Sequence, residues 1–156
     1  MINSKYNIED IINWFLSKEN MTPKKLQKLL YYAYAWDLVF ENETKHELNT
    51  QLFNEDFEAW VHGPVIPTVW SKYREYGYHE IDKINDVSDL NLDPDTIDTL
   101  NQVWDVYGGY NGNQLESITH QENPWKKARE NCLPLDRSNE KISKEVIFDY
   151  YVQRLN

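Results

Sequence analysis

Residues 22–41, TPKKLQKLLYYAYAWDLVFE, constrain the fold of this chain more than any other segment. Thr22 followed by Pro23 predicts a helix start, because a hydroxyl can accept a hydrogen bond at the N-cap and proline suits the first helical turn. Apolar side chains follow at helical spacing, and from Leu29 onward they cover the other faces too. A helix that is apolar on all sides is buried on several sides. We expect it at the centre of the domain, where Asp37 needs a hydrogen-bonding or cationic partner.

Other helices are predicted around this centre from caps, prolines and apolar periodicity. Residues 57–61 could form a short strand or an extended arm, ended by Gly63-Pro64. The 156 residues contain no internal repeat or linker. We therefore expect one domain over residues 1–156: a mainly α, compact helical globule around a buried central helix, with at most a small two-stranded β element. The remaining predicted helices cover approximately 7–19, 67–76, 93–108 (with Ile97, Leu100, Val103, Trp104 and Tyr107 inward), 113–121, 124–131 and 143–155.

The charge of the chain limits its partners. It carries 26 acidic and 16 basic residues, a formal net charge of −10. Such a surface repels phosphate backbones and anionic lipid, so we expect neither membrane binding nor direct nucleic-acid binding, whereas a basic protein would be attracted. The single cysteine, Cys132, excludes an internal disulfide, and no segment is apolar over a membrane-spanning length. We expect a cytoplasmic protein.

Much of the acidity is concentrated in one segment. Residues 80–105 contain eight acids and one base, Lys83. Such a run is usually a solvated face, but it could also be a docking surface for a basic partner. The candidate partner-binding acids in this segment are Asp86, Asp89, Asp93 and Asp95.

Catalytic and metal-binding patterns are sparse. The four histidines are dispersed, and none forms a helical i, i+4 pair. No phosphate-binding glycine loop occurs. We expect no catalytic residues, metal site or cofactor. One enzyme hypothesis stays open, in which His62 and His120 share a pocket.

The segment FEAWVHGPVIPTVW, residues 57–70, combines aromatic residues, a histidine and two prolines. Gly63-Pro64 predicts a turn, because glycine tolerates unusual backbone angles and proline restricts the exit. Trp60 and Trp70 are expected in the core. Near residue 120, Thr119 and His120 are expected to satisfy backbone groups while Trp125 fills the core.

Three motifs occur in order: MTPKKLQKLLYYAYAWDL, FEAWVHGPVIPTVWSKYREYG and LESITHQENPWKKAR. Together they resemble the SocA-like, Panacea-domain family of antitoxins, also known as phage-associated proteins, over residues 8–131. The resemblance implies a non-enzymatic helical domain that neutralises a cognate toxin by direct contact, with delivery to a ClpXP-type protease as a further role. The motif positions expected to be mainly structural are Leu26, Gln27, Leu29, Tyr32, Ala59, Gly63, Pro64, Thr119, His120, Pro124 and Trp125.

The partner implied is a toxin protein, expected to be basic and encoded by a neighbouring gene. In addition to the four acids above, Lys28, Tyr31, Trp60 and His62 are the candidate partner-binding residues, and the helix from Ser143 is a candidate docking element. The alternative is a phage- or mobile-element-encoded interaction protein that acts on a host factor as an acidic mimic of nucleic acid.

Overall fold

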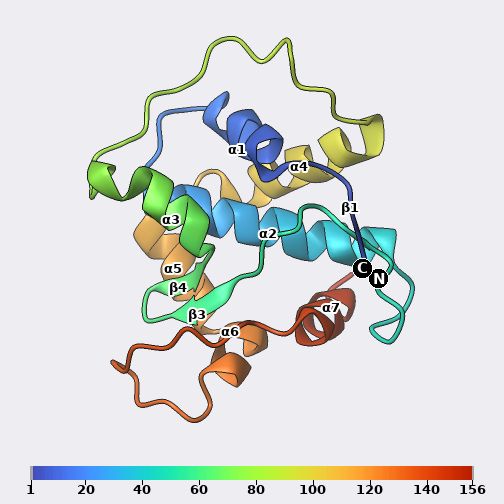
Figure 1. Ribbon diagram of the computed structural model, residues 1–156, viewed down its shortest axis with the longest axis vertical. Helices are drawn as coiled ribbons and strands as arrows, with labels where there is room; N and C mark the ends of the chain where they lie inside the picture. The colour runs from blue at the N-terminus through green and yellow to red at the C-terminus, as the bar shows by residue number, and fades with distance from the viewer. Residues whose placement is uncertain (1, 156) are drawn as a thin grey trace.

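The computed structural model describes residues 2–155 and is mainly α, as predicted (Figure 1). Two short β pairs accompany the helices. The helices are α1 (Ile8–Leu16), α2 (Pro23–Glu41), α3 (Pro67–Tyr73) with a 3₁₀ turn (Arg74–Tyr76), α4 (Pro94–Tyr107), α5 (Gly112–His120), α6 (Asn123–Ala128) and α7 (Lys144–Val152). The strands are β1 (Asn3–Ser4), β2 (Thr50–Gln51), β3 (Glu58–Trp60) and β4 (Gly63–Val65).

Helix α2 is the centre of the domain, which confirms the prediction from its all-round apolar character. It contacts α1, α3, α4, α5, α7, β2 and β4, and every residue from Lys25 to Ala35 is buried. Figure 1 shows the helix running through the middle of the molecule with the other elements around it. Its last turn reaches the surface, where Phe40 is exposed.

The helix starts follow the predicted caps. Side-chain oxygens at the N-caps accept hydrogen bonds from backbone N–H groups that have no partner within the helix. At α5, Asn111 and Gln114 form a complete capping box. The other side-chain caps are Asn7, Thr22, Asp93 and Ser143.

Asp37 has the cationic partner that its buried position requires. Lys5 Nζ, just after β1, donates to Asp37 Oδ1 at 3.0 Å. Burial raises the pKa of Asp37 to about 6, although Lys5 favours the charged form. The ion pair therefore attaches the N-terminal segment to the central helix.

Two β pairs are present among residues 2–155, where at most one was expected. Strands β1 and β2 pair in parallel, with Asn3 opposite Thr50. Strands β3 and β4 form an antiparallel hairpin. The β1–β2 pair joins segments distant in sequence, and two-residue strands carry no recognisable alternation. The sequence pattern therefore did not predict the β1–β2 pair.

Tyrosine hydroxyls on one side of α2 meet a half-buried carboxylate. Tyr32 and Tyr151 donate to Glu122 Oε1 at 2.8 and 2.7 Å. Burial raises the pKa of Glu122, while these two hydrogen bonds oppose the rise. Tyr151 lies on α7, whose buried face packs against α2 and α6. Helix α7 is thus part of the core, and only its outer face could serve as a docking element.

Some apolar predictions were wrong. Ile97 is exposed because α4 directs Leu100 and Val103 toward α2 instead. The last helix ends at Val152, so Leu155 lies beyond it and is exposed. No helix within residues 2–155 is both long and apolar enough to cross a membrane.

Candidate functional site

The β3–β4 hairpin is the place where the three sequence motifs meet. Ala59 pairs with Pro64 and Trp60 with Gly63, which leaves Val61 and His62 as a two-residue turn. Gly63 has a φ of 106°, a backbone angle that residues with a Cβ rarely adopt. The turn was predicted at Gly63-Pro64, but it lies two residues earlier, at Val61-His62, and Gly63 and Pro64 begin β4. The positive φ nevertheless requires glycine at position 63.

Helix α2 holds the exit of this hairpin through two motif residues. The Gln27 amide donates to the Ile66 carbonyl at 3.1 Å and accepts from the Ile66 N–H at 2.9 Å. Lys28 Nζ donates to the Pro64 carbonyl at 3.0 Å. All of these groups are buried, so the side chains of α2 replace the strand partner that β4 lacks on this side.

The third motif holds the other strand. Trp125 Nε1 donates to the Trp60 carbonyl at 2.8 Å, and an Arg129 N–H donates to the Ala59 carbonyl at 2.9 Å. Arg129 is also buried and donates to the Asp136 carbonyl at 2.7 Å. The sequence interpretation gave no role to Arg129, since a single arginine after two lysines looks like part of a solvated helix face.

Lys28 and Gly63 are in close contact inside the domain. A Cβ on Gly63 would lie 2.8 Å from Lys28 Cε and 3.0 Å from Thr119 Oγ1. Burial lowers the pKa of Lys28 to about 7, although the carboxylate of Glu116 opposes this shift. The amine lies at the junction of the three motifs. Its hydrogen bond to the Pro64 carbonyl offsets only part of the free-energy cost of removing the charged amine from water.

Thr119 and His120 support this corner from α5. Thr119 Oγ1 donates to the Glu116 carbonyl at 2.7 Å, as expected for a residue that satisfies backbone groups. The His120 ring stacks on Trp125, with centroids 4.0 Å apart. Burial lowers the pKa of His120. His62 instead is exposed and places Nδ1 3.2 Å from Glu116 Oε2. Both imidazoles thus lie near Glu116, but His62 is exposed whereas His120 stacks on Trp125.

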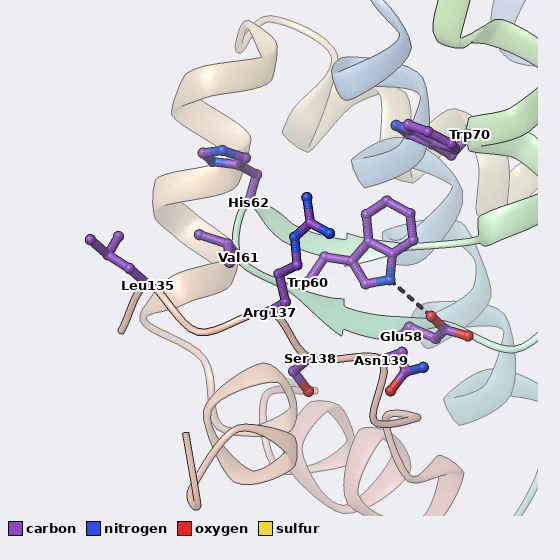
Figure 2. Close-up of a pocket in the computed structure, with 9 residues that line it drawn as sticks. All are labelled: Glu58, Trp60, Val61, His62, Trp70, Leu135, Arg137, Ser138 and Asn139. Atoms are coloured by element: carbon purple, nitrogen blue, oxygen red, sulfur yellow. Dashed lines mark hydrogen bonds between the residues drawn. The ribbon is translucent and has the colours of Figure 1, made fainter. Parts of the chain in front are cut away.

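A groove of about 820 Å³ lies on the outer face of the hairpin (Figure 2). The rings of Trp60 and Trp70 form part of its lining and meet edge to face, with centroids 5.6 Å apart. Its wall opposite α3 comes from the loop before α7, where Leu135 is 86% exposed. The lining residues are Glu58, Trp60, Val61, His62, Trp70, Leu135, Arg137, Ser138 and Asn139.

The expectation that both tryptophans lie in the core was wrong. Trp70 is 42% exposed and Trp60 is half-buried. Helix α3 turns Val69 and Tyr73 inward, so the adjacent Trp70 points outward. On β3, Ala59 faces the core, and Glu58 and Trp60 share the opposite face because side chains alternate along a strand.

The candidate partner-binding residues fall into three places. Trp60 and His62 line the groove. Lys28 and Tyr31 are each only 1% exposed, so neither presents its side chain to a protein that binds this structure. Their chemistry supports the fold: Lys28 holds the hairpin and Tyr31 packs among aromatic rings. The motif residues Leu26, Leu29, Tyr32, Ala59 and Pro124 are also buried.

The acidic candidates lie elsewhere, on the long connection to α4 and its first turn. Asp86, Asp89, Asp93 and Asp95 are all exposed. Figure 1 shows this connection arching on the opposite side of α2 from β3–β4. Asp93 has a structural role as well, because it caps α4 and accepts from the Tyr6 hydroxyl.

Within residues 2–155, no group of three or more histidine, cysteine or acidic side chains could hold a metal ion. The model for the family "Antitoxin SocA-like, Panacea domain" matches residues 26–126. This range includes Gln27, Lys28, the hairpin and Trp125. No curated protein and no solved structure matches the chain.

Proposed function

The chain belongs to the antitoxin SocA-like, Panacea domain family, and on that premise we propose that it neutralises a cognate toxin by direct protein–protein contact. The observation that carries the proposal is the aromatic groove on the hairpin at which the three motifs meet. We assign this groove as the main docking surface for the toxin.

The arrangement of the hairpin suits a binding surface. Gln27, Lys28, Trp125 and Arg129 all bond to backbone atoms of the segment 59–66, so its shape does not depend on the partner. A surface that is ordered before binding loses less conformational entropy when the complex forms. Exposed tryptophans in a concave site are also typical interaction hot spots.

The charge of the chain supports a basic partner. A net charge of −10 accelerates the encounter with a positively charged protein through long-range attraction. We infer that the toxin is basic, that a neighbouring gene encodes it, and that the complex forms in the cytoplasm. Masking of the toxin is the simplest mechanism, since the groove can cover a functional surface without any further component.

The first experiment expresses the small open reading frame next to this gene, alone and together with this protein. We expect growth arrest from the neighbour alone and growth on co-expression. Replacing both Trp60 and Trp70 with alanine should abolish the rescue. Tyr78→Ala, which also removes an aromatic ring but at a fully exposed position outside the groove, should retain the rescue. A harmless neighbour would refute the proposal, and full rescue by the double variant would refute the groove as the docking surface.

The same strain pair separates masking from delivery to a protease. If masking suffices, the toxin persists in the rescued cells and rescue survives deletion of the ClpXP-type protease. A toxin that disappears in rescued cells, with rescue lost in the protease mutant, would identify the protein as a proteolytic adaptor.

The exposed acidic connection favours one alternative, an acidic mimic that binds a host factor. Changing Asp86, Asp89 and Asp95 to lysine tests it and spares the helix cap Asp93. Under our proposal this triple variant still rescues growth, with slower association. Loss of all target capture in a pull-down, with the tryptophan variants unaffected, would favour the mimic.

A further inference from the structure

The chemistry of the groove indicates what kind of side chain it receives. Glu58 and Trp60 lie on the same face of β3, and Trp60 Nε1 donates to Glu58 Oε1 at 2.9 Å (Figure 2). This bond holds the carboxylate beside the indole ring. The Trp60 ring also meets Trp70 edge to face, so the groove combines a carboxylate with two adjoining aromatic rings.

The carboxylate of Glu58 has no counterion in the part of the chain that the structure describes. The neighbouring acid Asp56 has two, Lys141 and Lys144. Glu58 is also half-buried, so a neutral apolar side chain entering the groove would remove water from an unpaired charge, which is costly. A cationic side chain would pair with the carboxylate and stack on the indole rings at the same time.

The structure already contains a guanidinium on one of these rings. Arg74 lies over Trp70, 5.5 Å from the ring centroid. Arginine is better suited than lysine to such a place, because its flat, weakly hydrated guanidinium can stack and hydrogen-bond together. The net charge of −10 further favours a positively charged partner.

We propose that the groove is an arginine-recognition site, in which an arginine side chain of the protein partner packs against the indole rings of Trp60 and Trp70 and pairs with Glu58. This inference rests on the proposed function, because it names the chemistry by which the partner is bound. Arg137, on the loop wall of the groove, has no acidic partner among residues 2–155 and opposes an incoming cation. Removing the charge of Arg137 should therefore strengthen arginine binding, whereas removing the charge of Glu58 should weaken it.

The test uses three blocked peptides, acetyl-Gly-X-Gly-amide with arginine, norleucine or glutamate at X. Binding is followed through the indole N–H signals of the intact ¹⁵N-labelled protein, with Trp60 and Trp70 assigned from single Trp→Phe variants. We expect the arginine peptide to shift these two signals saturably and more strongly than the norleucine and glutamate peptides do.

Charge variants then decide the role of Glu58. Glu58→Gln keeps an acceptor for the Trp60 N–H but removes the charge, and we expect it to weaken the arginine peptide about three- to fivefold, as for a partly exposed ion pair. Arg137→Gln should strengthen binding. Glu140→Gln, an equal charge change on the adjacent segment and outside the groove, should leave binding unchanged.

Three results would overturn the inference: no saturable shift at Trp60 and Trp70, equal binding to wild type and Glu58→Gln, or a preference for the glutamate peptide that Arg137→Gln abolishes. None of them bears on toxin neutralisation, which the co-expression experiment measures separately. If growth is rescued but the arginine peptide does not bind, this inference alone is refuted. If the arginine peptide binds but the product of the neighbouring gene is harmless, only the antitoxin proposal is refuted.

Discussion

Replacing Lys28 with methionine is expected to change the pH dependence of folding stability. Methionine has a similar length and is apolar, so it fills the same space beside Gly63. It removes the amine whose pKa burial lowers to about 7. The variant therefore isolates the contribution of one buried charge at the junction of the three motifs.

The magnitude follows from the difference between this pKa and the ordinary value of 10.5. One pKa unit corresponds to about 1.4 kcal/mol, so the charged amine disfavours the folded state by on the order of 4 kcal/mol at pH 7. Between pH 7 and 10.5 the unfolded chain binds a proton that the folded chain does not, so the stability of the wild type rises with pH in that window. From pH 7 to pH 9 this rise amounts to about 2 kcal/mol.

Methionine also leaves the Pro64 carbonyl without its hydrogen bond, at a cost of about 1–3 kcal/mol that does not depend on pH. The free energy of unfolding of the variant, relative to wild type, should consequently be highest at or below pH 7 and fall by about 2 kcal/mol by pH 9.

Urea denaturation of both proteins at pH 7, 8 and 9 measures this difference. Lys126→Met, a substitution at an exposed position on α6, is the control and should track the wild type at every pH. The measurement stays at or below pH 9, because unfolded tyrosines titrate near pH 10. If wild type and Lys28→Met had parallel stability profiles, the amine would not be held neutral by burial and the reasoning would be refuted.

Two further predictions concern the hairpin. Gly63→Ala should lower the free energy of unfolding by at least about 2 kcal/mol in thermal or urea denaturation, because alanine disfavours the positive φ and its Cβ would lie 2.8 Å from Lys28 Cε. Gly109→Ala is the control and should cost little, because no atom lies within 4 Å of the new Cβ. Equal effects of the two substitutions would contradict this account. Gln27→Leu should destabilise by about 1–3 kcal/mol, because the buried N–H of Ile66 loses its acceptor, whereas the Ile66 carbonyl still accepts from the Trp70 N–H. The exposed Gln102→Leu should stay within about 0.5 kcal/mol of wild type, and a Gln27 variant this mild would mean that water satisfies Ile66.

Several features could be read from the chain because they depend on near neighbours in sequence. A cap followed by proline predicts a helix start from two residues, and the start at Thr22 is where the structure has it. Apolar residues around a whole helix imply burial wherever the other elements lie. The need of Asp37 for a partner followed from this burial, although the partner, Lys5, is 32 residues away and could not be identified.

The role of the motif residues depended on distant contacts. Gln27, Lys28 and Trp125 are all recognisable in the sequence, but their purpose becomes clear only when they bond to the backbone of segment 59–66. Lys28 looked like a surface residue because lysine is rarely buried. No local pattern distinguishes a lysine that binds a carbonyl from one that faces water.

The sequence by itself thus determined the helical class, the central helix and the family, since periodicity, caps and ordered motifs are local properties. Only the tertiary structure formed the candidate docking groove. The groove combines Glu58 and Trp60 on one strand with Trp70 on a helix and Arg137 on a distant loop. These side chains meet because Arg129 bonds both to β3 and to the loop, an arrangement that depends on long-range packing and leaves no periodic trace in the chain.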